Sequence, residues 1–199
     1  DTLTSEDLAR VFGRERVELK TPDQVLLMRR AGLVVADALA ATRAAARPGV
    51  TTGDLDAVAA RVIADAGATP SFLGYHGYPA TICVSVNDEV VHGIPGPREL
   101  RPGDVVSVDC GAVVDGWHGD SAVSFVLGEG DPQAEALVEA TRRAMWAGIA
   151  ALATSERLYD VGAAIEESVR VSGESDGVTY GIVEDYVGHG IVSAMHQPP

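Results

Sequence analysis

A β-hairpin near the middle of the chain constrains the fold more than any other feature. Residues 104–114 alternate apolar and polar side chains, residues 117–127 form a second run of strand type, and Asp115-Gly116 joins the two. An Asp-Gly pair suits a type I′ turn, because both central residues of that turn need a positive φ. The sequence therefore predicts two antiparallel strands with a two-residue connection.

This hairpin brings two acidic residues to one face. Counting outward from the turn pairs Gly111 with Asp120 and Asp109 with Ala122, so the two aspartates are diagonal neighbours with Cβ atoms about 7–8 Å apart or less. Gly111 and Ala122 are small and are expected to leave space above the carboxylates. Converging carboxylates repel by several kcal/mol, so either one is protonated or a cation lies between them. The alternative is that Asp109 ends a strand and Asp120 is solvated.

Helices and strands follow a repeated order along the chain. Capping signals at Thr21, Thr51 and Asp131 start helices, and β-branched runs follow the second helix of each half. The pattern predicts an α+β fold with two pseudo-symmetric helix-helix-strand halves, of which the second is incomplete. The expected helices span 22–46, 51–67, 131–153 and 158–171, and the further strands span 80–86 and 178–184.

Composition and charge exclude several classes of protein. The chain of 199 residues has 15 Lys and Arg against 29 Asp and Glu, a net charge of −14 that repels nucleic acid and anionic lipid. Its most apolar stretch, 31–46, contains Asp37 and Arg43 and is too short to span a membrane. We expect Cys83 and Cys110 to be buried free thiols, which favours the reducing cytoplasm.

Five further segments carry a resemblance to a known family. In this order along the chain they resemble the bacterial type I methionine aminopeptidases, metallopeptidases of the pita-bread fold. The matching segments are LKTPDQVLLMRRAG (19–32), GYHGYP (74–79), VNDEVVHGIP (86–95), VDCG with HGDS (108–111 and 118–121), and GHGI (188–191) with a histidine at 196.

The resemblance implies a fold and an activity. The fold is the pita-bread, creatinase/aminopeptidase-like one, a curved antiparallel sheet between two similar halves. Residues 19–199 would form this domain without its C-terminal strands, and residues 1–18 would be an N-terminal extension. The activity is metal-dependent removal of the initiator methionine from new proteins whose second residue is small.

The resemblance also implies roles for individual residues. Asp109, Asp120 and His189 would bind metal. His196 would stabilise the oxygen of the tetrahedral intermediate, and His92 would hold the peptide nitrogen. The side chain of the substrate methionine would bind among Phe72, Tyr75, Tyr78, Cys83 and Met195, with His92 beside them, because a thioether favours aromatic contacts. Without the resemblance, the simpler interpretation is that His92 is a turn residue and that the aromatic side chains are packing residues.

The cofactor expected from the resemblance is a pair of divalent ions, Co, Mn, Fe or Zn. The family uses two further glutamates that lie beyond Pro199, so we expect the 199 residues to hold at most one ion, loosely, with little or no peptidase activity, and to be a fragment of an enzyme. At Val192 the family usually has glycine. If that position needs a positive φ, valine costs about 1–2 kcal/mol and shifts the His189 loop.

Two other functions remain open at this stage. One is a non-catalytic pita-bread module that binds proteins or peptides, and the other is a proline-directed peptidase of the same fold. For the methionine enzyme, the expected partners are a peptide or nascent-chain N-terminus and the ribosome, without nucleic acid or membrane. We expect a monomer.

Overall fold

The computed structural model describes residues 19–184, 186 and 188–197. The expected extension 1–18 lies outside them, so it stays a prediction. The described elements are helices α2 (Pro22–Ala45), α3 (Thr52–Asp65), α4 (Pro132–Leu152) and α5 (Leu158–Asp176), strands β1 (Thr69–Pro70), β2 (Ile82–Val86), β3 (Val105–Val114) and β4 (Trp117–Val126), and a 3-10 turn (Tyr75–Gly77).

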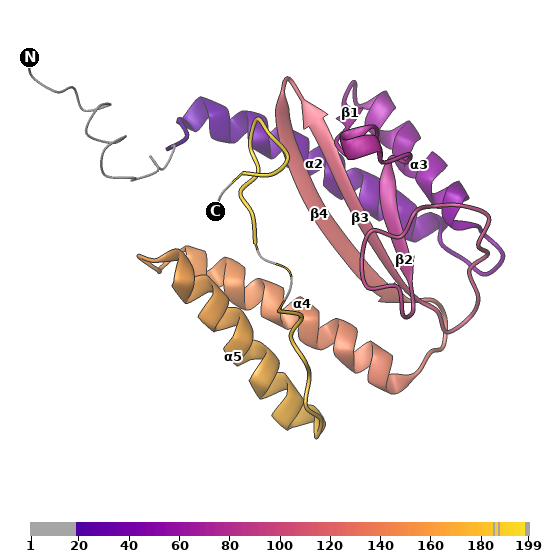
Figure 1. Cartoon of the computed structure of the whole chain (residues 1–199), viewed down its shortest axis with the longest axis vertical. Helices are drawn as coiled ribbons and strands as arrows, with labels where there is room; N and C mark the ends of the chain where they lie inside the picture. Colours follow the sequence, from indigo (N-terminus) through magenta and orange to yellow (C-terminus); the bar gives the residue numbers. More distant parts are fainter. Residues whose placement is uncertain (1–18, 185, 187, 198–199) are drawn as a thin grey trace, which may run out of the picture.

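Strand β3 is the centre of an antiparallel sheet (Figure 1). Strand β4 pairs along one edge of it, and β2 and β1 pair with successive parts of the other edge. The turn at Asp115-Gly116 has positive φ at both residues, as the predicted hairpin requires. The register pairs Gly111 with Asp120 and Asp109 with Ala122, which confirms the predicted pairing.

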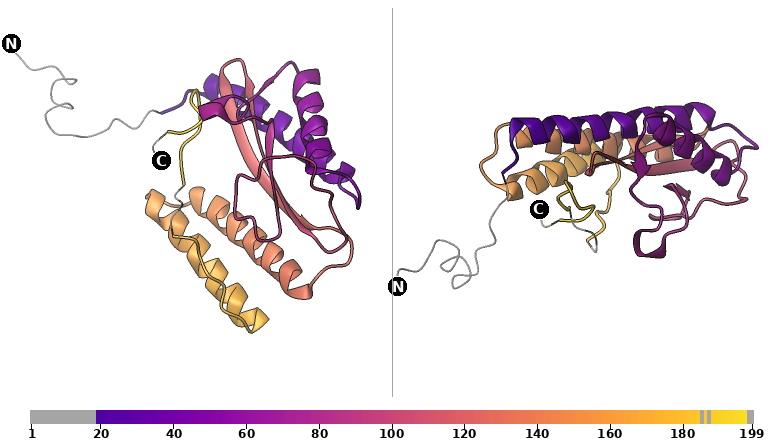
Figure 2. Two further views of the ribbon diagram at one scale, coloured as in Figure 1. Left: turned by 45° about the vertical axis from the view of Figure 1, so that its right-hand side comes forward. Right: turned by 90° about the horizontal axis from the view of Figure 1, so that it is seen from above.

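Helices α2 and α3 cover one face of the sheet (Figure 2). Both begin with the predicted capping boxes, Thr21 with Gln24 and Thr51 with Asp54. The core lies between these helices and the sheet, where Val106, Val108 and Cys110 of β3 are fully buried. Helix α2 lies directly on Gly119 of β4, since a Cβ there would approach the backbone of Gly32 to 2.6 Å.

Helices α4 and α5 form an antiparallel pair beside the sheet (Figures 1 and 2). Gly148 of α4 allows their close approach, because a Cβ there would lie 2.8 Å from Ile165. The repeat of a helix pair, together with the antiparallel sheet, confirms the predicted α+β class.

The predicted strand 178–184 is wrong, because the structure has no strand there. The segment folds back beside α5, where the backbone N–H of Val178 donates to Gly173 O at 2.9 Å. The Tyr180 hydroxyl donates to Asp176 Oδ2, also at 2.9 Å. Helix α5 continues past the predicted end at 171 and stops at Gly177, which has a φ of 70°. The short strand β1 and the 3-10 turn were not predicted.

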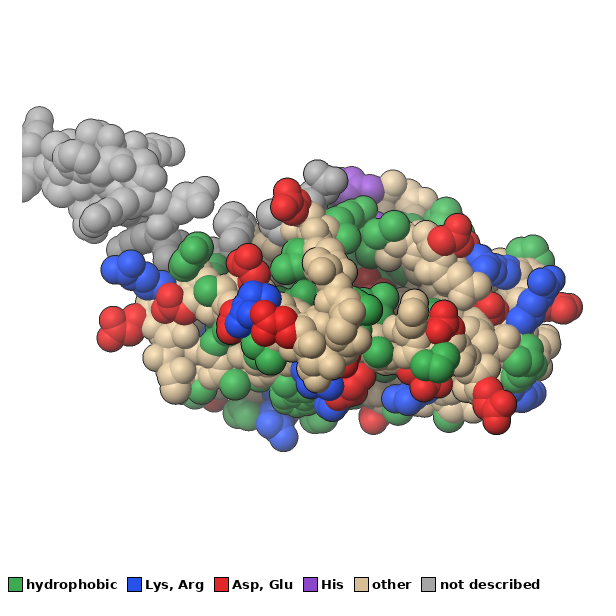
Figure 3. Space-filling view, turned by 90° about the horizontal axis from the view of Figure 1, so that it is seen from below, with side chains coloured by type: hydrophobic (Ala, Val, Ile, Leu, Met, Phe, Trp, Pro, Cys, Tyr) green, Lys and Arg blue, Asp and Glu red, His purple; other side chains and the backbone are tan. Residues whose placement is uncertain are grey.

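Charged and apolar side chains are interspersed over the face seen in Figure 3. None of the described helices has a stretch long and apolar enough to cross a membrane.

Candidate active site

A pocket of about 290 Å³ lies beside the predicted metal residues. Cys83 pairs with Asp109 across β2 and β3, and Asp120 is diagonal to Asp109 on the next strand, so the sheet presents the three on one face. The pocket is lined by all ten residues proposed from the sequence: Phe72, Tyr75, Tyr78, Cys83, His92, Asp109, Asp120, His189, Met195 and His196. The structure thus brings them together; their individual roles stay predictions.

The two aspartates behave as one acidic pair. Burial, with the charge of Asp120 next in importance, raises the pKa of Asp109 to about 7. Burial also raises the pKa of Asp120, against the favourable charges of His189 and His196. Burial and the mutual repulsion of the two carboxyl groups therefore favour one proton shared by the pair over two negative charges. Near neutral pH the pair resists carrying two negative charges without a cation.

A small loop brings His189 and His196 together. Gly190 and Gln197 exchange two backbone hydrogen bonds, of 2.7 and 2.8 Å, so that the residues just before them become neighbours. The ring centroids of His189 and His196 lie 4.4 Å apart. His189 Nδ1 lies 3.2 Å from the carbonyl oxygen of Gly190, to which only a protonated nitrogen can donate. In the neutral ring, the lone pair is then on Nε2, which lies 3.9 Å from Asp120 Oδ2.

His92 lies in a strained loop that is fixed to β2. Its φ of 58° is uncommon for a residue with a side chain and is typical of functional sites. The next residue, Gly93, lies against the strand: Val84 N–H donates to its carbonyl at 2.9 Å, and a Cβ on Gly93 would lie 2.2 Å from Val84 O. The Tyr78 hydroxyl also donates to Gly93 O, at 3.2 Å. Only glycine fits there, and this fit places His92 at the pocket.

The expected space above the two carboxylates is present as this pocket, but the volume directly at Gly111 is filled. A Cβ on Gly111 would lie 2.7 Å from the Phe72 ring and 2.8 Å from Ser71 Cβ, so these side chains fill the volume that glycine leaves. Glycine at this position lets Phe72 reach the pocket wall.

The backbone at Val192 does not have the positive φ that would strain a valine. Val192 is not among the described residues with positive φ, and its side chain is buried. Its carbonyl accepts a 2.7 Å hydrogen bond from His118 N–H, which ties the His189 loop to the edge of β4.

The donor chemistry of this pocket fits a divalent cation. Carboxylates with one imidazole suit Mn, Fe, Co or Zn, and a cation between Asp109 and Asp120 would relieve their repulsion. However, within the described residues no group of three or more His, Cys, Asp or Glu side chains is close enough together to hold a metal ion as arranged. The fit is therefore one of donor type and charge.

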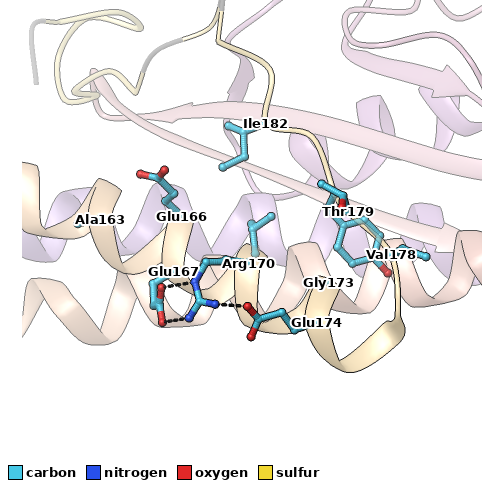
Figure 4. A pocket seen from close by; sticks show the side chains of 11 residues that line it. Ala163, Glu166, Glu167, Arg170, Gly173, Glu174, Val178, Thr179 and Ile182 are labelled. Carbon is cyan, nitrogen blue, oxygen red and sulfur yellow. Dashed lines mark hydrogen bonds and ion pairs between the residues drawn. The ribbon is translucent and has the colours of Figure 1, made fainter.

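A second cavity has different chemistry. It has a volume of about 470 Å³ and lies between α5 and residues 178–182 (Figure 4). Its main charged group, Arg170, is already paired with Glu167 and Glu174. Glu166, Glu167 and Glu174 are all exposed, and the last two bind that guanidinium, so this cavity has no buried acidic pair.

Two side-chain contacts at the site were missed by sequence reasoning. The Tyr75 hydroxyl lies 2.9 Å from His196 Nδ1, and Ser71 Oγ lies 3.0 Å from His118 Nδ1. Each joins residues far apart in the sequence, and no local pattern indicates such a contact. Cys83 and Cys110 are buried free thiols, as predicted.

Comparisons with known proteins agree on one family. Residues 26–199 match the model of metallopeptidase family M24. Methionine aminopeptidase 1 of Mycobacterium tuberculosis is 54% identical over 193 residues, covering 96% of this chain and 73% of the relative. Methionine aminopeptidase of Clostridium acetobutylicum is 44% identical, covering 91% and 70%. The crystal structure of methionine aminopeptidase from Rickettsia prowazekii superposes with a TM-score of 0.83 at 32% identity, covering 92% of this chain and 72% of that one.

Proposed function

Because the chain belongs to the methionine aminopeptidases of metallopeptidase family M24 and has their pita-bread fold, we propose that its site removes the initiator methionine from peptide N-termini whose second residue is small. The observation that carries the proposal is the convergence of the half-buried acidic pair, Asp109 and Asp120, with three histidines and a mostly apolar wall at one pocket.

The metal residues of this proposal are Asp109, Asp120 and His189. When bound there, a divalent ion supplies Lewis acidity toward water and the scissile carbonyl. The 199 residues contribute two carboxylates, or two negative charges, which balance one divalent ion. A second, uncompensated ion in a buried site would be very costly. We therefore propose at most one ion for this chain, of a metal that the donor set leaves open.

The histidines of the pocket act on the polar atoms of the substrate. His196 donates a hydrogen bond to the carbonyl oxygen as negative charge develops on it. His92 holds the peptide nitrogen once the bond is cut. Its strained loop fixes this position in advance, so no conformational cost arises during the reaction.

The apolar wall selects the side chain. Phe72, Tyr75 and Tyr78 provide aromatic surface, and Met195 and Cys83 add soft sulfur atoms. Thioether contacts with aromatic rings contribute about 0.3–1.5 kcal/mol each, which favours methionine over an unbranched hydrocarbon. We further propose a cytoplasmic monomer that acts on nascent chains near the ribosome.

Metal titration and a peptide assay test the proposal together. Calorimetric titration of the 199-residue chain with Mn²⁺ should give no more than one site. Asp109→Asn should weaken binding at least tenfold, because it removes one of two charges. Asp115→Asn, an exposed carboxylate at the hairpin turn, is the matched control and should bind like the wild type.

Methionine release from Met-Ala-Ser, compared with Met-Leu-Ser, supplies the second measurement. We expect slow release restricted to the alanine peptide, lost in Asp109→Asn. Rapid turnover with two bound ions would contradict the one-ion proposal alone. Metal binding without release from either peptide would instead favour the second candidate, a non-catalytic peptide-binding module.

A further inference from the structure

Tyr75 makes a contact that pocket lining does not require. Its hydroxyl lies 2.9 Å from Nδ1 of His196, which is 121 residues away in the sequence. The two rings are 5.5 Å apart and tilted by 36°, and the ring of His196 in turn lies 4.4 Å from that of His189. The contact therefore joins the loop before β2 to the loop that carries His189 and His196.

The loop of Tyr75 is internally braced. Tyr75 N–H donates to Phe72 O at 2.9 Å, Tyr78 N–H donates to Tyr75 O at 2.9 Å, and Gly74 N–H donates to Tyr78 O at 2.8 Å. Gly74 has a φ of 83°, which a residue with a side chain rarely adopts. The backbone under Tyr75 is thus fixed from both sides, so the hydroxyl approaches His196 from a defined direction.

The charges around the pocket favour one direction for the hydrogen bond. A neutral imidazole carries one proton, on either Nδ1 or Nε2. If Tyr75 donates to Nδ1, the proton is on Nε2. If Nδ1 donates to Tyr75, an Nε2 lone pair is left in a pocket that also contains the carboxyl groups of Asp109 and Asp120. An N–H is favoured over a lone pair beside negative charge.

We propose that Tyr75 is a positioning residue: its hydroxyl donates to Nδ1 of His196 and holds Nε2–H as the donor toward the bound substrate. This inference rests on the proposed function for its purpose, since His196 is there the group that stabilises the carbonyl oxygen. The direction of the hydrogen bond between Tyr75 and His196 can be tested without metal and without activity.

Nitrogen NMR of the full 199-residue chain, without metal, shows which ring nitrogen of His196 carries the proton. With His196→Gln identifying the signals, the wild type should show a protonated Nε2 and an Nδ1 resonance displaced by hydrogen bonding. Tyr75→Phe keeps the ring and should return Nδ1 to the position of a free ring nitrogen. Tyr78→Phe is the matched control, because that hydroxyl donates to Ile82 O and Gly93 O instead. A proton on Nδ1 in the wild type, or no change in Tyr75→Phe, would overturn the inference.

A binding cycle tests the purpose. With Mn²⁺ present, L-methioninamide should bind Tyr75→Phe several-fold more weakly than the wild type. In a His196→Gln background, Tyr75→Phe should have no further effect, because its contribution passes through that imidazole. Additive losses would show that Tyr75 acts only as pocket wall. If L-methioninamide does not bind the wild type, that result counts against the proposed function. The NMR measurement on His196 then decides by itself whether Tyr75 donates to Nδ1.

Discussion

At the scale of single residues, the acidic pair makes the metal-free chain sensitive to pH. The pKa of Asp109 is raised to about 7 by burial, with the charge of Asp120 as the next cause, whereas the unfolded chain releases this proton near 3.8. Between these values the folded chain holds a proton that the unfolded chain has lost. The contribution of Asp109 to the free energy of unfolding is therefore greatest below about pH 4 and falls as pH rises toward 7.

Asp109→Asn should remove this dependence of the free energy of unfolding on pH. In EDTA, the variant should gain on the order of 1–3 kcal/mol relative to the wild type between about pH 4 and pH 8, measured by urea unfolding. Mn²⁺ at pH 8 should restore the stability of the wild type and leave the variant unchanged. Asp115→Asn controls for the change in net charge. A variant that differs from the wild type equally at both pH values would show that Asp109 is not shifted.

Gly93 supports a second prediction at this scale. Its replacement by Ala would place a methyl group 2.2 Å from Val84 O, so the loop must leave β2. We expect a loss of about 1–3 kcal/mol in the free energy of unfolding, as for overpacked sites, together with loss of methioninamide binding through displaced His92. Gly96→Ala is the control, because a Cβ on Gly96 would come no closer than 4.0 Å, to the carbonyl oxygen of Ile94. Similar stability of the two variants would argue against the close contact.

Residue patterns predicted part of the site, and contacts across the fold account for the rest. Asp109 and Asp120 follow from the turn chemistry of Asp115-Gly116, because a two-residue hairpin fixes the register outward from its turn. His189 and His196 came only from the family resemblance, since no local rule relates them to the hairpin. The filled space at Gly111 and the contact of Tyr75 with His196 depend on how distant loops pack, which sequence spacing does not encode.

At the scale of secondary-structure elements, Asp56 joins α3 to the start of β2. Its Oδ1 accepts hydrogen bonds from the backbone N–H groups of Thr81 and Ile82, at 2.8 and 3.0 Å. Both of these residues are buried, so water cannot replace the acceptor easily. The contact fixes the strand that carries Cys83 and that anchors the loop of His92.

Asp56→Ala should therefore destabilise the chain by about 2–4 kcal/mol, because two buried donors lose their acceptor. Asp56→Asn keeps an oxygen at the same place and should recover at least half of that loss. Urea unfolding of the three proteins at one pH measures the difference. Equal losses for Ala and Asn would mean that the negative charge, and not the acceptor oxygen, holds the strand.

The strand wrongly predicted at 178–184 illustrates a limit at the same scale. Its β-branched residues favour an extended backbone, but a strand also needs a neighbour with free N–H and C=O groups. The described residues instead pair Val178 with the end of α5. Helix α5 itself runs past the predicted end and includes Gly173. A Cβ at Gly173 would lie 2.7 Å from Val178 O, so glycine there lets the returning segment approach the helix. Propensity alone penalises that glycine.

At the scale of the molecule, the net charge of −14 acts on ligands before they reach the pocket. The acidic pair adds local negative charge at a site proposed to receive a free α-amino group and a cation. Exposed charges are screened beyond about 10 Å at 0.1 M salt, so the long-range part of this attraction depends on ionic strength. Contacts inside the pocket depend on it much less.

Raising the salt from about 0.02 to 0.5 M should therefore slow association of a fluorescent Met-Ala-Ser peptide with an amidated C-terminus, whose only charge is its α-amino group. We expect its association with the Mn²⁺-loaded chain to slow by about tenfold or more, while its dissociation rate changes little. Stopped-flow fluorescence measures both rates. The same peptide with an acetylated N-terminus has no α-amino charge and should show a weaker salt dependence. Because the electrostatic field arises from the whole chain, Asp115→Asn should hardly change the dependence of the association rate on salt. A salt effect confined to the dissociation rate would place the dominant electrostatic interaction inside the pocket, not in the field around the molecule.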